Sequence, residues 1–248
     1  MIPRLYVTAD LAAGRLVESE DVHYLRTVLR LAEGAAVELF NGRDGGWRGR
    51  IEQLGKKAAA IRVDTQVAAQ APVPDLMLMF APLKKTRIDF VVEKATELGV
   101  ARLWPVLTDH AITDRVNERR LAEIAREAAE QCGRLSVPEV REPRRLRDTF
   151  DLLAGEGRRL FVADETGGGI AAADAFAAAV LPAAILIGPE GGFSAAELDL
   201  MRRLDIVNAI DLGPRILRAE TAAVAALACF QALCGDWRKG PVPRVPAS

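Results

Sequence analysis

The sequence is poor in the residue types that hold metal ions and disulfides. It has three cysteines and two histidines in 248 residues, and none of them has the paired spacing of a zinc site. The cysteines are therefore expected to be unpaired thiols in a reducing cytosol. No apolar run reaches the roughly 18 residues of a membrane span, and no signal pattern opens the chain. We expect a soluble, cytoplasmic protein that binds no metal and no membrane.

A strong charge of either sign is also missing. The chain has 33 basic and 34 acidic residues, which gives a net charge of -1. This balance excludes a protein that coats nucleic acid through bulk positive charge, although a local basic face remains possible. Half of the residues are apolar, so the chain has enough apolar surface for one large domain or two modest ones.

The common phosphate-binding and nucleophile motifs are absent too. Neither G-x-x-x-x-G-K-S/T nor G-x-G-x-x-G occurs, and the three glycines at 167–169 lie in a polar loop without either spacing. Neither histidine lies in a nucleophile motif, so a Ser-His-Asp arrangement is not supported. The chemistry is expected to come mainly from a bound cofactor or from the positioning of the reacting groups.

Two regions with different patterns follow each other along the chain. Residues 1–70 are β-rich, with strands predicted at 4–7, 35–40, 47–53 and 58–63 and one helix that carries Arg26 and Arg30, which indicates a small barrel. The segment Pro72-Val-Pro74 is extended because proline restricts itself and its predecessor, so we place the domain boundary there.

From residue 75 onward strands alternate with helices. Strands are predicted at 76–81, 102–106, 160–163, 183–187 and 206–212, and the longer helices at 86–98, 117–131 and 220–234. Such alternation is typical of an α/β fold with a mainly parallel sheet covered on both sides. We assign 75–236 to this second domain and 237–248 to a flexible tail.

Two loops of the second region carry most of the functional signal. Gly188-Pro-Glu-Gly-Gly-Phe-Ser194 follows one predicted strand, and Leu212-Gly-Pro-Arg-Ile-Leu-Arg218 follows another. We expect both loops at the carboxyl ends of neighbouring strands, where open α/β sheets bind ligands. Ser194 and Glu197 predict a capping box for the helix that follows. Two plain turns are the alternative, but the arginines around Ile216 and Leu217 favour a ligand site.

These loops belong to a longer set of motifs in a fixed order. The others are His23-Tyr-Leu-Arg-Thr-Val-Leu-Arg30, Lys84, Glu93-Lys-Ala-Thr-Glu-Leu-Gly-Val100, Glu130-Gln-Cys-Gly-Arg134 with Val137-Pro-Glu139, and Glu220-Thr-Ala222. Together they resemble the RsmE-type ribosomal RNA uracil-N3 methyltransferases of the SPOUT superfamily, over nearly the whole chain. Each motif alone is weak, but the combination is highly specific.

The resemblance implies a fold and a reaction. The fold is an N-terminal PUA-like β-barrel followed by a SPOUT domain, whose mainly parallel sheet contains a deep trefoil knot. The reaction is methylation by S-adenosylmethionine of N3 of a specific uridine in small-subunit (16S) ribosomal RNA, free or in the assembled small ribosomal subunit. The family also implies a homodimer that holds the target nucleotide near the cofactor.

The resemblance also implies site residues, position by position. The cofactor contacts would be Leu186, Gly188, Glu190, Gly192, Leu212, Gly213, Arg215, Ile216, Leu217 and Thr221. Arg218 and Arg134, which lie in or near the loops, are candidates for stabilising a uracil anion. Glu190 is either a catalytic carboxylate or an acceptor that orders its loop. RNA contacts are expected from Arg4, His23, Arg26, Arg30 and Lys84. His110 stands where many relatives have arginine.

Two other functions remain open at this point. One is a SPOUT enzyme that methylates a ribose 2'-hydroxyl or a transfer RNA. The other is a non-catalytic RNA-binding protein of ribosome assembly. Intact loops argue against a protein without turnover, since such a protein has no need of two glycine-bearing loops at one crevice.

Overall fold

The computed structural model describes residues 2–19, 22–113, 115–164 and 166–237. Among these residues the chain forms two compact units: 2–72 with Ala129–Val137, and Val73–Ala128 with 138–237. The segment Ala129–Val137 thus belongs to the first unit, whereas the pattern of the sequence placed it in the second domain. The predicted tail at 237–248 lies outside the described residues, apart from Trp237.

The first unit is built on a five-stranded sheet. Its strands lie in the order β1 (Arg4–Tyr6), β3 (Ala36–Phe40), β4 (Gly46–Leu54), β5 (Ala59–Ala68) and β2 (Leu16–Ser19). β1 is parallel to β3, and the other pairs are antiparallel. A five-residue π-type helix (Tyr24–Val28) lies between β2 and β3 in the chain. Strand β2 was not predicted, although its exposed and buried residues alternate.

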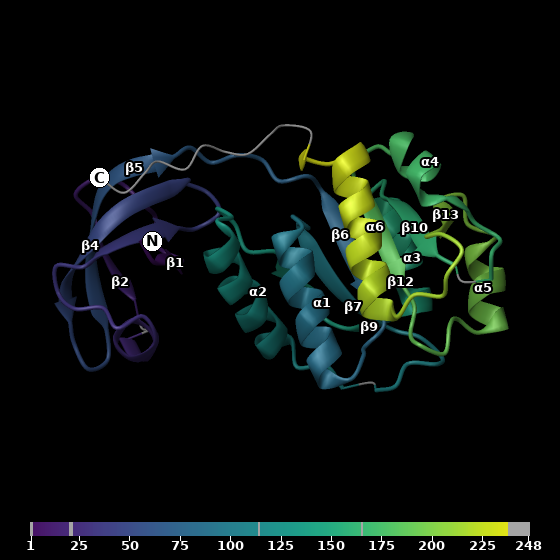
Figure 1. Cartoon of the computed structure of the whole chain (residues 1–248), viewed down its shortest axis with the longest axis horizontal. Helices are drawn as coiled ribbons and strands as arrows, with labels where there is room; N and C mark the ends of the chain where they lie inside the picture. The colour runs from purple at the N-terminus through teal and green to yellow at the C-terminus, as the bar shows by residue number, and fades with distance from the viewer. Residues whose placement is uncertain (1, 20–21, 114, 165, 238–248) are drawn as a thin grey trace. The chain divides into compact units, whose positions relative to one another are not determined.

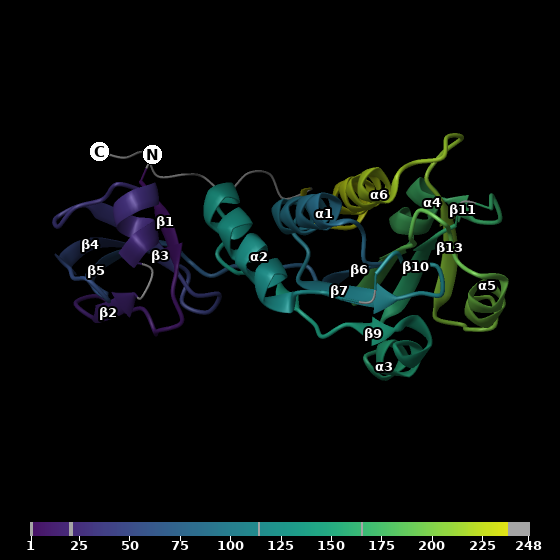
Figure 2. The same ribbon diagram turned by 90° about the horizontal axis from the view of Figure 1, so that it is seen from below.

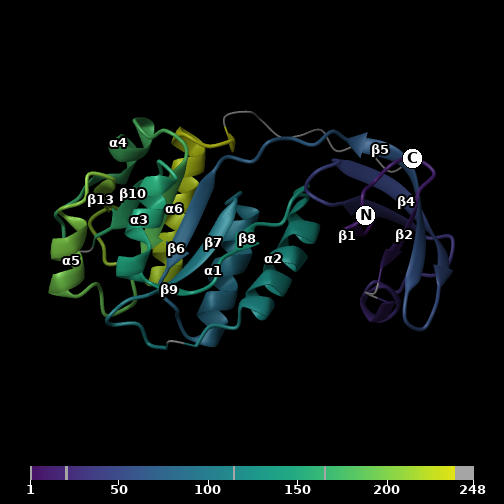
Figure 3. The ribbon, with the colours of Figure 1, turned by 180° about the vertical axis from the view of Figure 1, so that it is seen from behind.

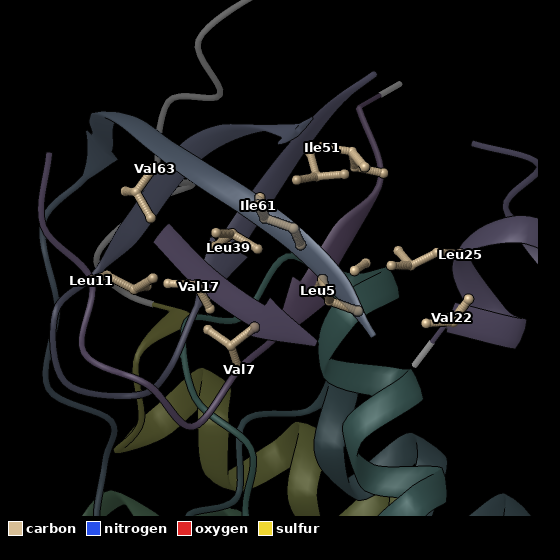
Figure 4. Packing of buried hydrophobic residues seen from close by; sticks show 12 residues of the cluster. Leu5, Val7, Leu11, Val17, Val22, Leu25, Leu39, Ile51, Ile61 and Val63 are labelled. Atoms are coloured by element: carbon tan, nitrogen blue, oxygen red, sulfur yellow. The ribbon is translucent and has the colours of Figure 1, made fainter. Parts of the chain in front are cut away.

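The sheet of the first unit wraps around its own apolar core (Figure 4). Alternate residues of each strand point inward, as the period of two in a β-strand requires. Val37 and Leu39 of β3 and Ile61 and Val63 of β5 are completely buried, and Leu25 of the short helix joins them. The prediction of a β-rich N-terminal domain with one helix is confirmed.

The second unit contains an eight-stranded parallel sheet. The order is β11 (Ile170–Ala171), β13 (Val207–Asp211), β10 (Arg159–Ala163), β12 (Ala183–Ile187), β6 (Leu76–Phe80), β7 (Arg102–Leu107) and β8 (Glu139–Val140), and β9 (Arg144–Arg145) pairs with the end of β7. Every pairing is parallel. This confirms the prediction of an α/β unit with a parallel sheet.

Helices cover both faces of this sheet (Figure 2). On one face lie α1 (Lys85–Glu97), α4 (Ala172–Ala177) and α6 (Ala219–Leu233), and on the other lie α3 (Phe150–Gly155) and α5 (Ala195–Met201). α1 and α6 pack side by side, in front of the strands in Figure 1 and behind them in Figure 3. The remaining long helix, α2 (Glu118–Cys132), ends within the segment that belongs to the first unit.

The two faces of the sheet have separate cores. Met77, Met79 and Leu186 point toward α3 and α5 and pack with Phe150 and Met201. On the opposite face, Phe161 of β10 meets Phe176 of α4 edge to face at 5.2 Å, and Phe230 of α6 completes the group. Burial on both sides explains why the central strands read as continuous apolar runs.

Candidate functional site

A pocket of about 480 Å³ lies at the carboxyl ends of β10, β12 and β13. Because the strands are parallel, the segments that follow them converge at one edge of the sheet. Asp164 and Thr166 line the pocket after β10, Glu190 and Phe193 after β12, and Arg215 and Arg218 after β13. Its volume lies within the usual range of small-molecule sites, about 300–1,000 Å³.

The strand order corrects one prediction. The two glycine-bearing loops were expected on neighbouring strands, but β10 lies between β12 and β13. A third segment therefore contributes to the pocket, with Ala163, Asp164, Thr166 and Gly167. The glycines at 167–169 lack a phosphate motif and were not predicted to bind a ligand. Gly167 lines the pocket, and its position shortly after the mostly buried strand β10 is the signal that identifies this segment.

The first pocket loop, residues 188–194, is called the glycine loop below. Gly188 has no room for a side chain, because a Cβ there would lie 2.9 Å from the ring of Phe193. Gly192 has φ +67°, which favours glycine, and its N–H donates to the carbonyl of Pro189 at 3.0 Å. The loop is thus a tight turn that exposes backbone to the pocket.

The predicted capping box ends this loop and begins α5. Ser194 Oγ accepts from the N–H of Glu197, and Glu197 Oε2 accepts from the N–H of Ser194 at 2.9 Å. Phe193 and Leu198, on either side of the cap, line the pocket and pack against the same buried cluster. The box satisfies two N–H groups that would otherwise have no partner in the helix, so it fixes the point where the loop ends.

The segment after β7 holds the glycine loop from outside. His110 Nδ1 lies 3.1 Å from the carbonyl oxygen of Gly191 and 3.2 Å from that of Gly192. Since carbonyl oxygens only accept, Nδ1 carries the proton and donates. Asp109 adds a second link, because its Oδ2 accepts from Ser194 Oγ at 2.6 Å. His110 therefore contacts the loop itself, a role that the sequence analysis did not predict.

The second pocket loop, residues 212–218, is called the arginine loop below. Gly213 has φ +106°, and its N–H donates to Asp211 Oδ1 at 2.7 Å. Ile216 is 86% exposed, although it is apolar. Arg215 and Arg218 are exposed and make no ion pair with any residue in the described ranges. Two free guanidinium groups at a pocket provide sites for an anionic ligand or substrate.

Arg218 stands at the start of α6. It occupies the N-cap position of this helix, and its carbonyl accepts from the N–H of Ala222 at 2.8 Å. Its side chain makes no capping hydrogen bond. The guanidinium is therefore not used by the helix and is available to the pocket.

Glu190 of the glycine loop is already paired. Its Oε1 accepts from Arg87 Nη1 of α1 at 2.7 Å. The carboxylate of Glu190 is thus engaged in an ion pair between the loop and α1. This contact favours a role for Glu190 in ordering the loop over a role as general base.

Most of the predicted cofactor residues line this pocket. Those that do are Gly188, Glu190, Gly192, Leu212, Gly213, Arg215, Ile216 and Leu217, together with the catalytic candidate Arg218. Leu186 and Thr221 are not among the lining residues. Leu186 packs its side chain in the core toward α3 and α5, and Thr221 is exposed on α6.

Arg134 and four of the five predicted RNA contacts lie in the first unit. Arg134 belongs to Ala129–Val137, and its carbonyl accepts from Arg4 Nη2 at 2.8 Å. The guanidinium of Arg4 also lies over the ring of Phe40 at 4.8 Å, with its side chain only 14% exposed. These internal contacts do not favour a phosphate contact for Arg4.

His23, Arg26 and Arg30 are exposed. Arg26 donates to the carbonyls of Leu54 and Gly55 at 2.8 and 3.1 Å, which brings the short helix to the β4–β5 turn. Lys56 and Lys57 are exposed in that turn. The sequence analysis missed these two lysines, although two adjacent basic residues in a turn were visible in the sequence. Lys84, the fifth candidate, is exposed at the start of α1 in the second unit.

In the described part of the chain, no three His, Cys, Asp or Glu side chains are placed to bind a metal ion. No helix in these ranges is long and apolar enough to cross a membrane.

The comparisons with known proteins agree with this geometry. An RNA methyltransferase domain family matches residues 69–231, and an RNA methyltransferase PUA domain family matches residues 17–64. The ribosomal RNA small subunit methyltransferase E of Rickettsia conorii is 31% identical over 234 residues, which cover 91% of this chain and 93% of that protein.

Two solved structures are similar over almost the whole chain. The ribosomal RNA small subunit methyltransferase E of Neisseria gonorrhoeae, bound to S-adenosyl methionine, has a TM-score of 0.81 and 28% identity and covers 96% of this chain and 100% of its own. A protein of Legionella pneumophila in complex with the cofactor SAM has a TM-score of 0.81 and 30% identity, with 94% and 98% covered. The chain therefore belongs to the RsmE family of ribosomal RNA small subunit methyltransferases, with a PUA-like domain and a SPOUT methyltransferase domain.

Proposed function

We propose that this protein transfers a methyl group from S-adenosylmethionine to N3 of a specific uridine in small-subunit ribosomal RNA, in the cytoplasm. The observation that carries the proposal is the pocket of three converging segments, with two unpaired arginines in its wall. The proposal is supported by relatives named ribosomal RNA small subunit methyltransferase E, one of which was solved with S-adenosyl methionine bound.

The pocket residues suit this cofactor. Apolar side chains of Ile187, Phe193 and Ile210 offer a surface for the adenine ring, and the glycines let the backbone approach closely. Asp164 and Asp211 supply carboxylates for hydroxyl or ammonium groups of the ligand. Backbone of the glycine and arginine loops would hold the rest, and Arg215 provides a partner for the carboxylate end.

The cofactor, when bound, supplies an activated methyl group on a positively charged sulfur. The residues of the chain must then hold N3 of the uracil in line with that methyl group, which is mainly a matter of orientation. N3 must lose its proton to an acceptor, in the simplest case water, before it takes the methyl group, so negative charge develops on the uracil ring. The guanidinium of Arg218 lines the pocket, and we expect it to stabilise this charge.

The target uridine must be unpaired or rotated out of a helix, because N3 lies on the pairing edge of the base. Basic side chains in both units provide phosphate contacts for such an RNA. Arg26, Lys56 and Lys57 lie together in the first unit, and Lys84 lies at the start of α1 in the second. The net charge of -1 means that such binding depends on local clusters and not on bulk charge.

The test is methyl transfer to unmodified small ribosomal subunits, with labelled S-adenosylmethionine and nucleoside analysis of the product. N3-methyluridine is expected, and free ribosomal RNA run in parallel identifies the preferred form of the substrate. Label in a 2'-O-methylated nucleoside or in transfer RNA would favour another SPOUT reaction. Cofactor binding without label in any RNA would favour the non-catalytic assembly protein. The homodimer and the trefoil knot stay predictions, and light scattering tests the first.

A further inference from the structure

We propose that Arg87 is a positioning residue that couples the glycine loop to the arginine loop and thereby shapes the cofactor site. This inference rests on the proposed function, because it assigns a role to Arg87 in the binding of S-adenosylmethionine. Arg87 does not line the pocket. It acts through two glutamates, one from each side of the pocket.

The geometry places one guanidinium between two carboxylates. Arg87 Nη1 lies 2.7 Å from Glu190 Oε1, and Arg87 Nε lies 3.6 Å from Glu220 Oε1. Glu190 is in the middle of the glycine loop, and Glu220 is the second residue of α6, two positions after the arginine loop. The three side chains are 30%, 29% and 18% exposed, so solvent screens them only in part.

The electrostatics require a cation at this point. The two carboxylates contact the same guanidinium in a partly buried site, and this positive charge offsets the repulsion between their like charges. Glu220 Oε2 is buried and has no hydrogen-bond partner among the described residues. The Arg87 guanidinium lies at Oε1 of the same carboxylate, so loss of Arg87 would remove a compensating charge from a side chain that is only 18% exposed.

The position of Arg87 in its own helix supports its role as a partner of the two glutamates. Arg87 is in the first turn of α1, which has no acidic residue there and no side-chain cap. A cation near a helix N-terminus opposes the helix dipole, so the helix itself gains nothing from Arg87. The two glutamates explain the placement.

The shape of the side chain matters as well as its charge. A guanidinium is planar and can bind two partners through N–H groups on different edges, whereas a lysine ammonium is a compact point charge. Arg87→Lys is therefore expected to keep the positive charge near the two glutamates but to hold only one of them closely. We expect the coupling of the two loops to depend on the guanidinium group.

The first experiment compares cofactor binding by calorimetry in the full-length protein. Arg87→Met is expected to raise the dissociation constant for S-adenosylmethionine about tenfold, and Arg87→Lys about threefold. Both changes correspond to free energies within the range of interaction energies between contacting residues. Arg120→Met is the matched control. This variant removes the ion pair between Arg120 of α2 and Asp89 of α1. Neither residue belongs to the two pocket loops.

A charge rescue separates this role from a loss of stability. Arg87→Met combined with Glu220→Gln removes the repulsion together with the cation, so affinity is expected to return to within about threefold of the wild type. A purely structural role predicts no rescue. It also predicts that Arg120→Met, which costs a similar ion pair, weakens binding as much as Arg87→Met.

Hydrogen exchange in the free protein tests the coupling without any cofactor. Arg87→Met is expected to speed exchange of the N–H groups of Gly192 and Ala222, which lie on the two sides of the pocket and are both hydrogen-bonded. Arg120→Met should leave both unchanged.

The outcomes are distinct. Equal affinity in wild type and Arg87→Met, or exchange that changes on one side only, overturns the coupling by Arg87 and leaves the proposed function intact. If the wild type itself fails to bind S-adenosylmethionine, the proposed function fails, and the exchange experiment still decides whether Arg87 couples the loops.

Discussion

The two loops of the pocket differ in how they are held. The glycine loop is fixed from several directions: by its own turn, by the capping box at Ser194, and by the donor at His110. The arginine loop has a bond from Gly213 to Asp211 at the end of β13, but its side chains at Arg215, Ile216 and Arg218 are exposed. Both loops follow strands of the same sheet, so the difference comes from the contacts around them.

This difference indicates that the two loops have different roles in ligand binding. A loop fixed before the ligand arrives costs little ordering entropy on binding, and it can position a ligand accurately. A loop with exposed apolar and charged side chains has few contacts to lose, so we expect its local opening to cost little free energy. We expect the glycine loop to form a rigid wall and the arginine loop to adjust to cofactor and RNA.

The largest effect is expected from the arginine loop. Arg218→Ala should lower kcat for methyl transfer about hundredfold, as loss of a charge-stabilising donor does in other enzymes, while the cofactor still binds. Arg218→Lys should retain part of the rate because it keeps the charge. Arg203→Ala, an exposed arginine outside the pocket, is the control. Near-normal turnover in Arg218→Ala with cofactor bound would exclude the catalytic role.

A smaller effect is expected when the glycine loop loses its outer support. His110→Ala removes the donor to the carbonyls of Gly191 and Gly192, and the dissociation constant for S-adenosylmethionine should rise about fivefold, the worth of about one hydrogen bond. His110→Asn should bind nearly normally, because its amide nitrogen is attached to Cγ as Nδ1 is. If the alanine variant bound as tightly as the wild type, the loop would not depend on this contact.

The capping box gives a prediction about stability. Ser194→Ala should reduce the free energy of unfolding by about 1 kcal/mol, measured by chemical denaturation, because α5 loses its cap. Ser194→Thr keeps a hydroxyl and should restore most of the loss. α6 begins at Arg218 without a side-chain cap, so Arg218→Ala should cost clearly less. Equal losses in the two alanine variants would contradict the comparison of the loops.

The smallest effect concerns the exposed apolar residue of the arginine loop. Ile216→Ser should change the free energy of unfolding by no more than about 0.5 kcal/mol, because the side chain is 86% exposed. We expect it to weaken cofactor binding about threefold, since closure of the loop would bury this side chain, and a buried side chain of this type contributes about 1.5–3 kcal/mol at most. An unchanged dissociation constant would show that Ile216 stays exposed when the cofactor binds.

The sequence alone determined most of the local structure. Strand and helix periods predicted the β-rich first unit and the parallel second unit, since alternation and apolar runs follow directly from which faces are buried. The capping box at Ser194 and Glu197 and the arginine loop were visible as short local motifs. Interactions within a few residues of one another can be predicted in this way, because the chain itself brings the partners together.

Only the tertiary structure decided which distant segments meet. The insertion of β10 between β12 and β13 brought a third segment to the pocket, and no local pattern specifies the order of strands in a sheet. The pairs Arg87–Glu190 and His110–Gly191 join residues 103 and 81 positions apart. Arg4 likewise has internal partners, although it was expected to contact RNA. Such contacts depend on how the whole sheet and its helices pack, and so only the folded chain reveals them.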